Sequence, residues 1–170
     1  MEVLNDFNTT VEKALSEIDQ DWRSYSGLIV CGTHSPHDVD EMIKQIKWYR
    51  ENGAPFLGIC FGHQLAAIEY ARNVLGIQSA TSEEFFPDHL DLSKLKSIIV
   101  RRRPDGLKVG LHDGETYWNN YEVIPEFESM WKKLDNFITV QYHPEYQSSR
   151  EKPHPILVKF LDLCRKQASS

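Results

Sequence analysis

The chain has 170 residues and a mass of 19.7 kDa, which suits one domain with a core of useful size. Its 41% hydrophobic and 26% charged residues are ordinary for a globular protein and exclude collagen, coiled coil and wholesale disorder. A formal net charge of −6 leaves no basic field for phosphate backbones, so nucleic acid is not expected as a partner.

Cysteine usage and the N-terminus predict a cytoplasmic protein. Cys31, Cys60 and Cys164 are an odd number without C-x-x-C spacing, which indicates free thiols rather than a disulfide framework or a zinc ribbon. The first residues lack the pattern of a signal peptide, and no run approaches the ~18 apolar residues of a membrane span. No membrane contact is expected.

Helix-period and β-rich segments alternate along the chain, which is typical of an α/β fold. In chain order we expect a helix at 11–18, a strand at 27–31, a helix at 39–49, a strand at 55–59, a helix at 63–75, strands at 97–101 and 137–142, and a helix at 156–164. Asp105-Gly106 and Asp113-Gly114 are expected to form turns. The uninterrupted apolar run at 27–31 is typical of a parallel strand buried on both faces. The pattern predicts an open, mostly parallel sheet with helices on both faces.

Residues 58–62, Gly-Ile-Cys-Phe-Gly, place Cys60 in a strand-to-helix turn between two glycines. Such a turn lifts the side chain above the sheet edge, and the following helix N-terminus favours the nucleophilic thiolate. The alternative is a buried cysteine that acts as a small hydrophobe.

His143-Pro144-Glu145 follows the strand at 137–142. Residues two apart on an extended segment face the same side, so Glu145 can orient one ring nitrogen of His143 while the other faces a nucleophile. Because the carboxyl ends of parallel strands share one edge, Cys60 and His143 are expected to meet there. Taken alone, His143 reads as a surface histidine or one with its hydrogen bonds satisfied.

Two further groups have weaker signals. His34, His37, Asp38 and Asp40, near Cys31, invite a metal interpretation, but a polar loop after a strand explains them better, and no metal or cofactor is expected. Tyr117, Trp118 and Tyr121 either line a ligand pocket or pack in a core, which is the commoner role of aromatic residues near a strand.

Several motifs carry a family resemblance. Residues 58–64 together with His143-Pro144-Glu145 resemble the nucleophile elbow and His-Glu pair of class I glutamine amidotransferases. Within that class, residues 68–76, 80–85, 121–123, 141–146 and 153–157 resemble the glutaminase domain of CTP synthases. The likeness implies flavodoxin-like layering. It runs from Gly27 to the C-terminus, whereas residues 1–26 match poorly, so the first βα unit of a single domain over 1–170 is expected to be reduced or missing.

The resemblance implies roles for individual residues. Cys60 would attack a side-chain amide and release ammonia through a thioester, with His143 as the proton shuttle and Glu145 as its orienter. Two other positions, Gln64 and Glu84, would hold glutamine. The backbone N–H of Phe61 and the loop after Gly32 would form the oxyanion hole.

Three departures from the family pattern bear on substrate and partner. Thr33 follows Gly32 where the family has a second glycine, and a β-branched residue resists positive φ, so the oxyanion hole is expected to be reshaped. Asn120 stands where the family has an arginine for the α-carboxylate of glutamine. The chain is too short for the ATP-dependent synthetase domain and has no P-loop, so ammonia would go to solvent or to a synthetase partner in trans.

The sequence is compatible with three functions. The first is a glutaminase that takes a small glutamine-like amide. The second retains Cys60, His143 and Glu145 but hydrolyses another γ-glutamyl or primary amide, as Asn120 would favour. The third is a non-catalytic binding module that retains the fold.

Overall fold

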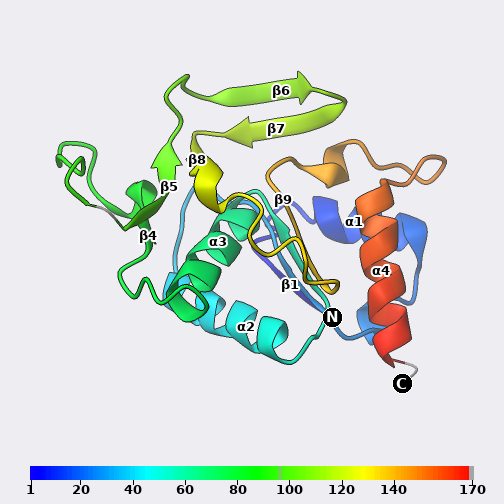
Figure 1. The fold of residues 1–170 in the computed structure, drawn as a ribbon. Coiled ribbons are helices and arrows are strands. Elements are labelled where there is room, and N and C mark those ends of the chain that lie inside the picture. Colours follow the sequence, from blue (N-terminus) through cyan, green and yellow to red (C-terminus); the bar gives the residue numbers. More distant parts are fainter. Residues whose placement is uncertain (96, 169–170) are drawn as a thin grey trace.

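The computed structural model describes residues 1–95 and 97–168 and contains a four-stranded parallel sheet in the order β1-β2-β3-β9 (Figure 1). The strands are β1 (Glu2–Leu4), β2 (Leu28–Val30), β3 (Phe56–Ile59) and β9 (Phe137–Val140). The last three confirm the strands expected at 27–31, 55–59 and 137–142, each shortened by one or two residues.

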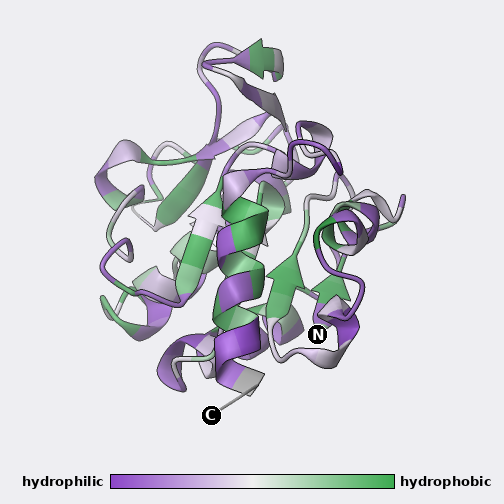
Figure 2. Ribbon diagram, turned by 90° about the vertical axis from the view of Figure 1, so that its right-hand side faces the viewer, coloured by the Kyte–Doolittle hydropathy of each residue, from purple (hydrophilic) through white to green (hydrophobic). Residues whose placement is uncertain are grey.

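Helices cover both faces of this sheet, as the alternation of segments predicts. One face carries α2 (Val39–Glu51) and α3 (Phe61–Asn73), and the other carries α1 (Thr10–Ile18) and α4 (Pro155–Ala168). Successive residues of β2 serve opposite faces: Leu28 packs in the α2–α3 core and Ile29 in the α1–α4 core. Figure 2 shows α4 lying in front of the green, hydrophobic strands. The α/β fold class is confirmed.

The N-terminal segment, expected to hold a reduced or missing βα unit, forms a short one. Its strand β1 has three residues and pairs in parallel with β2, and its helix α1 has nine. The carboxylate of Asp6 accepts hydrogen bonds from the backbone N–H groups of Val11 and Glu12 at 3.2 and 2.9 Å, which satisfies donors in the first turn of α1. The loop between β1 and α1 therefore has a defined course next to the site described below.

Beyond the central sheet lie a small sheet and a hairpin. The small sheet has the order β4-β5-β8, from β4 (Thr81–Ser82), β5 (Ile98–Arg102) and β8 (Tyr121–Val123). The hairpin, β6 (Lys108–His112) and β7 (Glu115–Asn119), projects at the top of Figure 1. The sequence predicts the turn of this hairpin but not its strands, and at the turn Asp113 and Gly114 both have positive φ. The backbone N–H of His143 donates to the Thr116 oxygen at 2.7 Å, which attaches the hairpin to the site.

The described residues also contain short 3-10 turns at Trp22–Ser24, Glu83–Phe85, Pro125–Phe127 and Pro144–Tyr146. Within residues 1–95 and 97–168, no helix has the length and apolar character that crossing a bilayer needs.

Candidate active site

Cys60 lies in the turn that joins β3 directly to α3, at φ 55° and ψ −103°, a strained conformation for a residue with a side chain. The flanking glycines permit the turn: a Cβ at Gly58 would lie 2.7 Å from the Gly62 carbonyl oxygen, and one at Gly62 would overlap the carbonyl oxygen of Val30. The helix begins at Phe61, two residues before the predicted start. The N–H of Phe61 is therefore among the unpaired donors at the start of α3.

The ends of β2, β3 and β9 bring Gly32, Cys60 and His143 together. A Cβ at Gly32 would lie 3.0 Å from Cε1 of His143 and 3.2 Å from Cβ of Cys60, so a glycine is needed between them. His143 Nδ1 lies 2.7 Å from Oε1 of Glu145, and both side chains are buried. The expected meeting of the thiol with the His-Glu pair is thus present in the geometry.

The charge state of His143 depends on its two partners. Burial lowers the pKa of the imidazole, but hydrogen bonds and charge interactions with Cys60 and Glu145 outweigh burial, and the net effect raises the pKa above its ordinary value. With Nδ1 committed to Glu145, Nε2 is the nitrogen left for the sulfur. This arrangement favours the imidazolium form of His143 beside the Cys60 sulfur.

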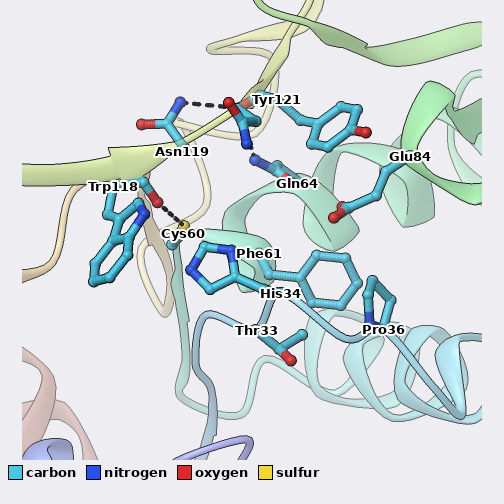
Figure 3. Close-up of a pocket in the computed structure, with 11 residues that line it drawn as sticks. Thr33, His34, Pro36, Cys60, Phe61, Gln64, Glu84, Trp118, Asn119 and Tyr121 are labelled. Atoms are coloured by element: carbon cyan, nitrogen blue, oxygen red, sulfur yellow. Dashed lines mark hydrogen bonds between the residues drawn. The ribbon is translucent and has the colours of Figure 1, made fainter. Parts of the chain in front are cut away.

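A cavity of about 340 Å³ opens beside Cys60 (Figure 3). Four residues expected to bind substrate line it together with Cys60, namely Phe61, Gln64, Glu84 and Asn120. The fifth, Gly32, does not line this cavity, although its neighbour Thr33 does. Trp118 and Tyr121 also line it, as in the pocket alternative, whereas Tyr117 packs edge-on against Tyr142 at 6.0 Å.

Gln64 and Glu84 line the cavity with different groups, a hydrogen-bonded amide and a titratable carboxyl. The buried Gln64 donates from Nε2 to the Tyr121 backbone oxygen at 3.0 Å and to Oε1 of Gln141 at 3.3 Å. Burial raises the pKa of Glu84 to about 7 against an opposing effect of the Arg102 charge. The Glu84 carboxyl therefore changes its charge near neutral pH.

The fold brings to the site two further residues that the sequence does not predict there. Gln141 donates from Nε2 to the Cys60 sulfur at 3.6 Å. Gln141 follows β9 directly and stands two residues before His143. Because residues two apart on an extended segment face the same side, this spacing could have indicated its place in the site. Asn119 is buried, donates to the Tyr121 oxygen at 2.9 Å, and leaves Oδ1 without a hydrogen-bond partner. Nothing in the sequence predicts its place, since the hairpin carries it there.

Thr33 and Asn120, the two binding positions that depart from the family pattern, have different surroundings in the structure. Neither Gly32 nor Thr33 has a positive φ, so the branched side chain of Thr33 meets no backbone strain. Asn120 is exposed at the rim of the cavity. Near it, the guanidinium of Arg102 lies 5.1 Å from the centre of the Tyr121 ring and donates to the Tyr121 hydroxyl at 2.9 Å.

The residues considered as metal ligands have other contacts. The ring of His34 lies 5.3 Å from that of Trp118, and His37 lies 6.4 Å from Phe7. Over the described ranges, no group of three or more histidine, cysteine, aspartate or glutamate side chains has a metal-binding arrangement. The three cysteines are buried and free.

Comparisons with known proteins identify the family of the chain. Residues 4–163 match the family model for class I glutamine amidotransferases. Curated CTP synthases from Nautilia profundicola and Sulfolobus acidocaldarius are 30% and 32% identical over 89% and 92% of this chain. The chain spans 38% and 37% of their lengths.

A solved structure has the same fold. The Trypanosoma brucei CTPS glutaminase domain with bound acivicin superposes with a TM-score of 0.74, covering 97% of this chain and 92% of that one at 20% identity. At that identity the likeness concerns the fold alone. The family match over most of the chain is the stronger evidence, and by it this protein belongs to the class I glutamine amidotransferases.

Proposed function

We propose that the protein is a glutaminase that releases ammonia from the side-chain amide of glutamine. The observation that supports this most is the position of Cys60, which has the His143–Glu145 pair close by and the cavity lined by Gln64 and Glu84 in front of it. A fold alone needs no thiol beside an oriented imidazole, so the arrangement favours catalysis over a non-catalytic binding role.

The chemistry follows from these placements. The Cys60 thiolate attacks the amide carbon, and the N–H of Phe61, with that of Thr33, stabilises the oxyanion. The imidazolium of His143 protonates the departing ammonia, so that the C–N bond breaks and a thioester remains. His143, now neutral, takes a proton from water, which hydrolyses the thioester to glutamate. Glu145 holds the imidazole in place throughout.

We further propose that the ammonia serves a synthetase partner in trans. The curated relatives, of which this chain spans 38% and 37%, are named CTP synthases, which supports a synthetase as the ammonia acceptor. The three free cysteines favour the reducing cytosol as its location.

Ammonia release from millimolar glutamine by the purified protein tests the function directly. Release that exceeds the uncatalysed rate supports a glutaminase. Silence on glutamine in the presence of hydrolysis of another γ-glutamyl amide would show a different substrate, and silence on both would favour a non-catalytic protein.

The titration of Glu84 predicts pH-dependent binding. Below pH 7 the carboxyl is mostly neutral and loses its attraction for the α-ammonium group of glutamine; above pH 7 it is ionised. With a pKa of about 7 for Glu84, the affinity for glutamine should rise roughly tenfold from pH 6 to pH 8. Calorimetric titration of glutamine into the Cys60→Ala variant measures this without turnover. Glu84→Gln should flatten the profile. A flat profile with Glu84 intact, or a rise with pH that persists in Glu84→Gln, would contradict the assignment.

Because position 120 holds an asparagine, we expect weak binding of the α-carboxylate of glutamine. Asn120→Arg should tighten glutamine binding by about 1.5–3 kcal/mol, because a bidentate cation replaces a neutral amide. The dissociation constant, again in the Cys60→Ala background, measures the gain, and Asn120→Gln is the neutral control. An unchanged constant in a folded Asn120→Arg variant would mean that the carboxylate binds elsewhere, with Arg102 the next residue to substitute.

A further inference from the structure

A second cavity, of about 580 Å³, meets the first at Cys60. Both cavities are lined by Thr33, His34, Cys60 and Trp118. The second is walled on its far side by the loop between β1 and α1. Hydrolysis of glutamine requires of it only room for ammonia to leave and for water to enter.

The two cavities divide the reacting groups between them. Gln64 and Glu84 line the first cavity only, whereas His143 and Glu145 line the second only. Because His143 protonates the leaving nitrogen, that nitrogen must face the second cavity while the γ-glutamyl group occupies the first. The scissile C–N bond therefore points from the first cavity into the second.

The second cavity is larger than ammonia needs. A molecule of water's size takes about 30 Å³ of liquid volume, whereas ligand cavities commonly measure about 300–1,000 Å³. At about 580 Å³ this cavity has the size of a ligand site. It can hold a leaving group with a substantial organic body.

The residues that line the second cavity determine which charge and polarity the leaving group can have. Asp6 and Glu145 supply carboxylates, and the described residues that line the cavity include neither lysine nor arginine. The positive charge that His143 carries is paired with the Glu145 carboxylate, whose Oε1 lies 2.7 Å from Nδ1. Three aromatic side chains offer apolar surface, Phe7, Trp118 and Tyr146, which are 67%, 48% and 47% exposed. An anionic group is disfavoured here, and a neutral or cationic one is accepted.

We propose that the second cavity binds the amine half of a γ-glutamyl amide, so that the protein hydrolyses γ-glutamyl derivatives of neutral or cationic amines that carry an aromatic or aliphatic body. The inference rests on the proposed function, since it uses the same thiol and proton donor. The C–N bond breaks, His143 gives its proton to the amine, and water then hydrolyses the thioester, so that amide and water yield glutamate and a free amine. No other reactant is required.

Two chromogenic substrates that differ by one carboxylate test the proposal beside glutamine. γ-Glutamyl-4-nitroanilide has a neutral aromatic leaving amine, and γ-glutamyl-3-carboxy-4-nitroanilide adds a negative charge to the same ring. We expect kcat/KM for the neutral anilide to equal or exceed that for glutamine, and to exceed that for the carboxylated anilide by about tenfold or more.

Variants then locate the leaving group. Asn8→Trp fills the second cavity from an exposed position and should lower kcat/KM for the neutral anilide by about tenfold, leaving glutamine within about twofold. Phe7→Ala removes one aromatic wall and should raise KM for the anilide severalfold. Lys13→Trp, on the exposed side of α1 and outside the cavity, is the matched control and should change neither substrate.

The outcomes separate this proposal from the proposed function. Glutamine hydrolysis without anilide hydrolysis, or an equal effect of Asn8→Trp on both substrates, would overturn the leaving-group site and leave the glutaminase intact. Failure to hydrolyse any of the three substrates would overturn both proposals. Anilide hydrolysis without glutamine hydrolysis would support the second cavity and refute only the choice of glutamine.

Discussion

Cys60→Ala is expected to reduce ammonia release from glutamine to the uncatalysed rate, a loss of about 10⁴-fold or more in kcat. The reason is that neither His143 nor the N–H of Phe61 can attack the amide carbon, so the covalent route is closed. The fold should persist, because the hydrogen bonds of the sulfur to the Trp118 oxygen and from Gln141 are long, at 3.7 and 3.6 Å. A coupled ammonia assay measures the rate, and circular dichroism confirms folding.

A second thiol serves as the control for that experiment. Cys164 is buried in α4, away from both cavities, and Cys164→Ala should retain turnover at some cost in stability. Were folded Cys60→Ala to retain more than about a hundredth of the wild-type rate, Cys60 could not be the nucleophile.

Arg50→Met is expected to lower the free energy of unfolding by about 3–5 kcal/mol. Glu69 on α3 is fully buried, and its Oε2 receives hydrogen bonds of 3.0 Å from Arg50 on α2 and from Asn73. Without the guanidinium, an uncompensated carboxylate stays in the interface between the two helices, or must take up a proton to fold. Urea unfolding followed by tryptophan fluorescence measures the loss.

The double variant Arg50→Met/Glu69→Leu shows whether the lost stability comes from the unpaired buried charge or from lost packing. Since both charges are then absent, most of the lost stability should return. A cost below about 1 kcal/mol for Arg50→Met alone would mean that water reaches Glu69 and that the pair is a surface ion pair in energetic terms.

The central sheet was predictable because its signals are local. The run at 27–31 is apolar throughout, and β2 is buried on both faces, as such a run requires. The hairpin of β6 and β7 lacked that signal: Val109 and Leu111 are 55% and 66% exposed, and Gly110 has a positive φ in the middle of a strand. Its pairing depends on the turn and on its attachment to His143 rather than on a buried face.

The residues of the candidate site also fall into predictable and unpredictable ones. Cys60, His143 and Glu145 belong to short motifs whose geometry follows from strand ends, so sequence analysis could name them. Asn119 and the wall formed by Phe7 come from segments far from those motifs in the chain, and tertiary structure alone brings them to Cys60. The second cavity has no sequence pattern of its own.

The strained backbone at Cys60 lowers the stability of the fold, whereas its thiol is needed for the proposed activity. A residue held at such a φ and ψ costs about 1–3 kcal/mol, a sizeable part of the 5–15 kcal/mol that a domain typically has. Glycine at this position would relieve the strain and remove the thiol in one step. Selection of variants for thermal resistance alone would therefore enrich inactive proteins at position 60, and engineering for stability must hold this residue constant.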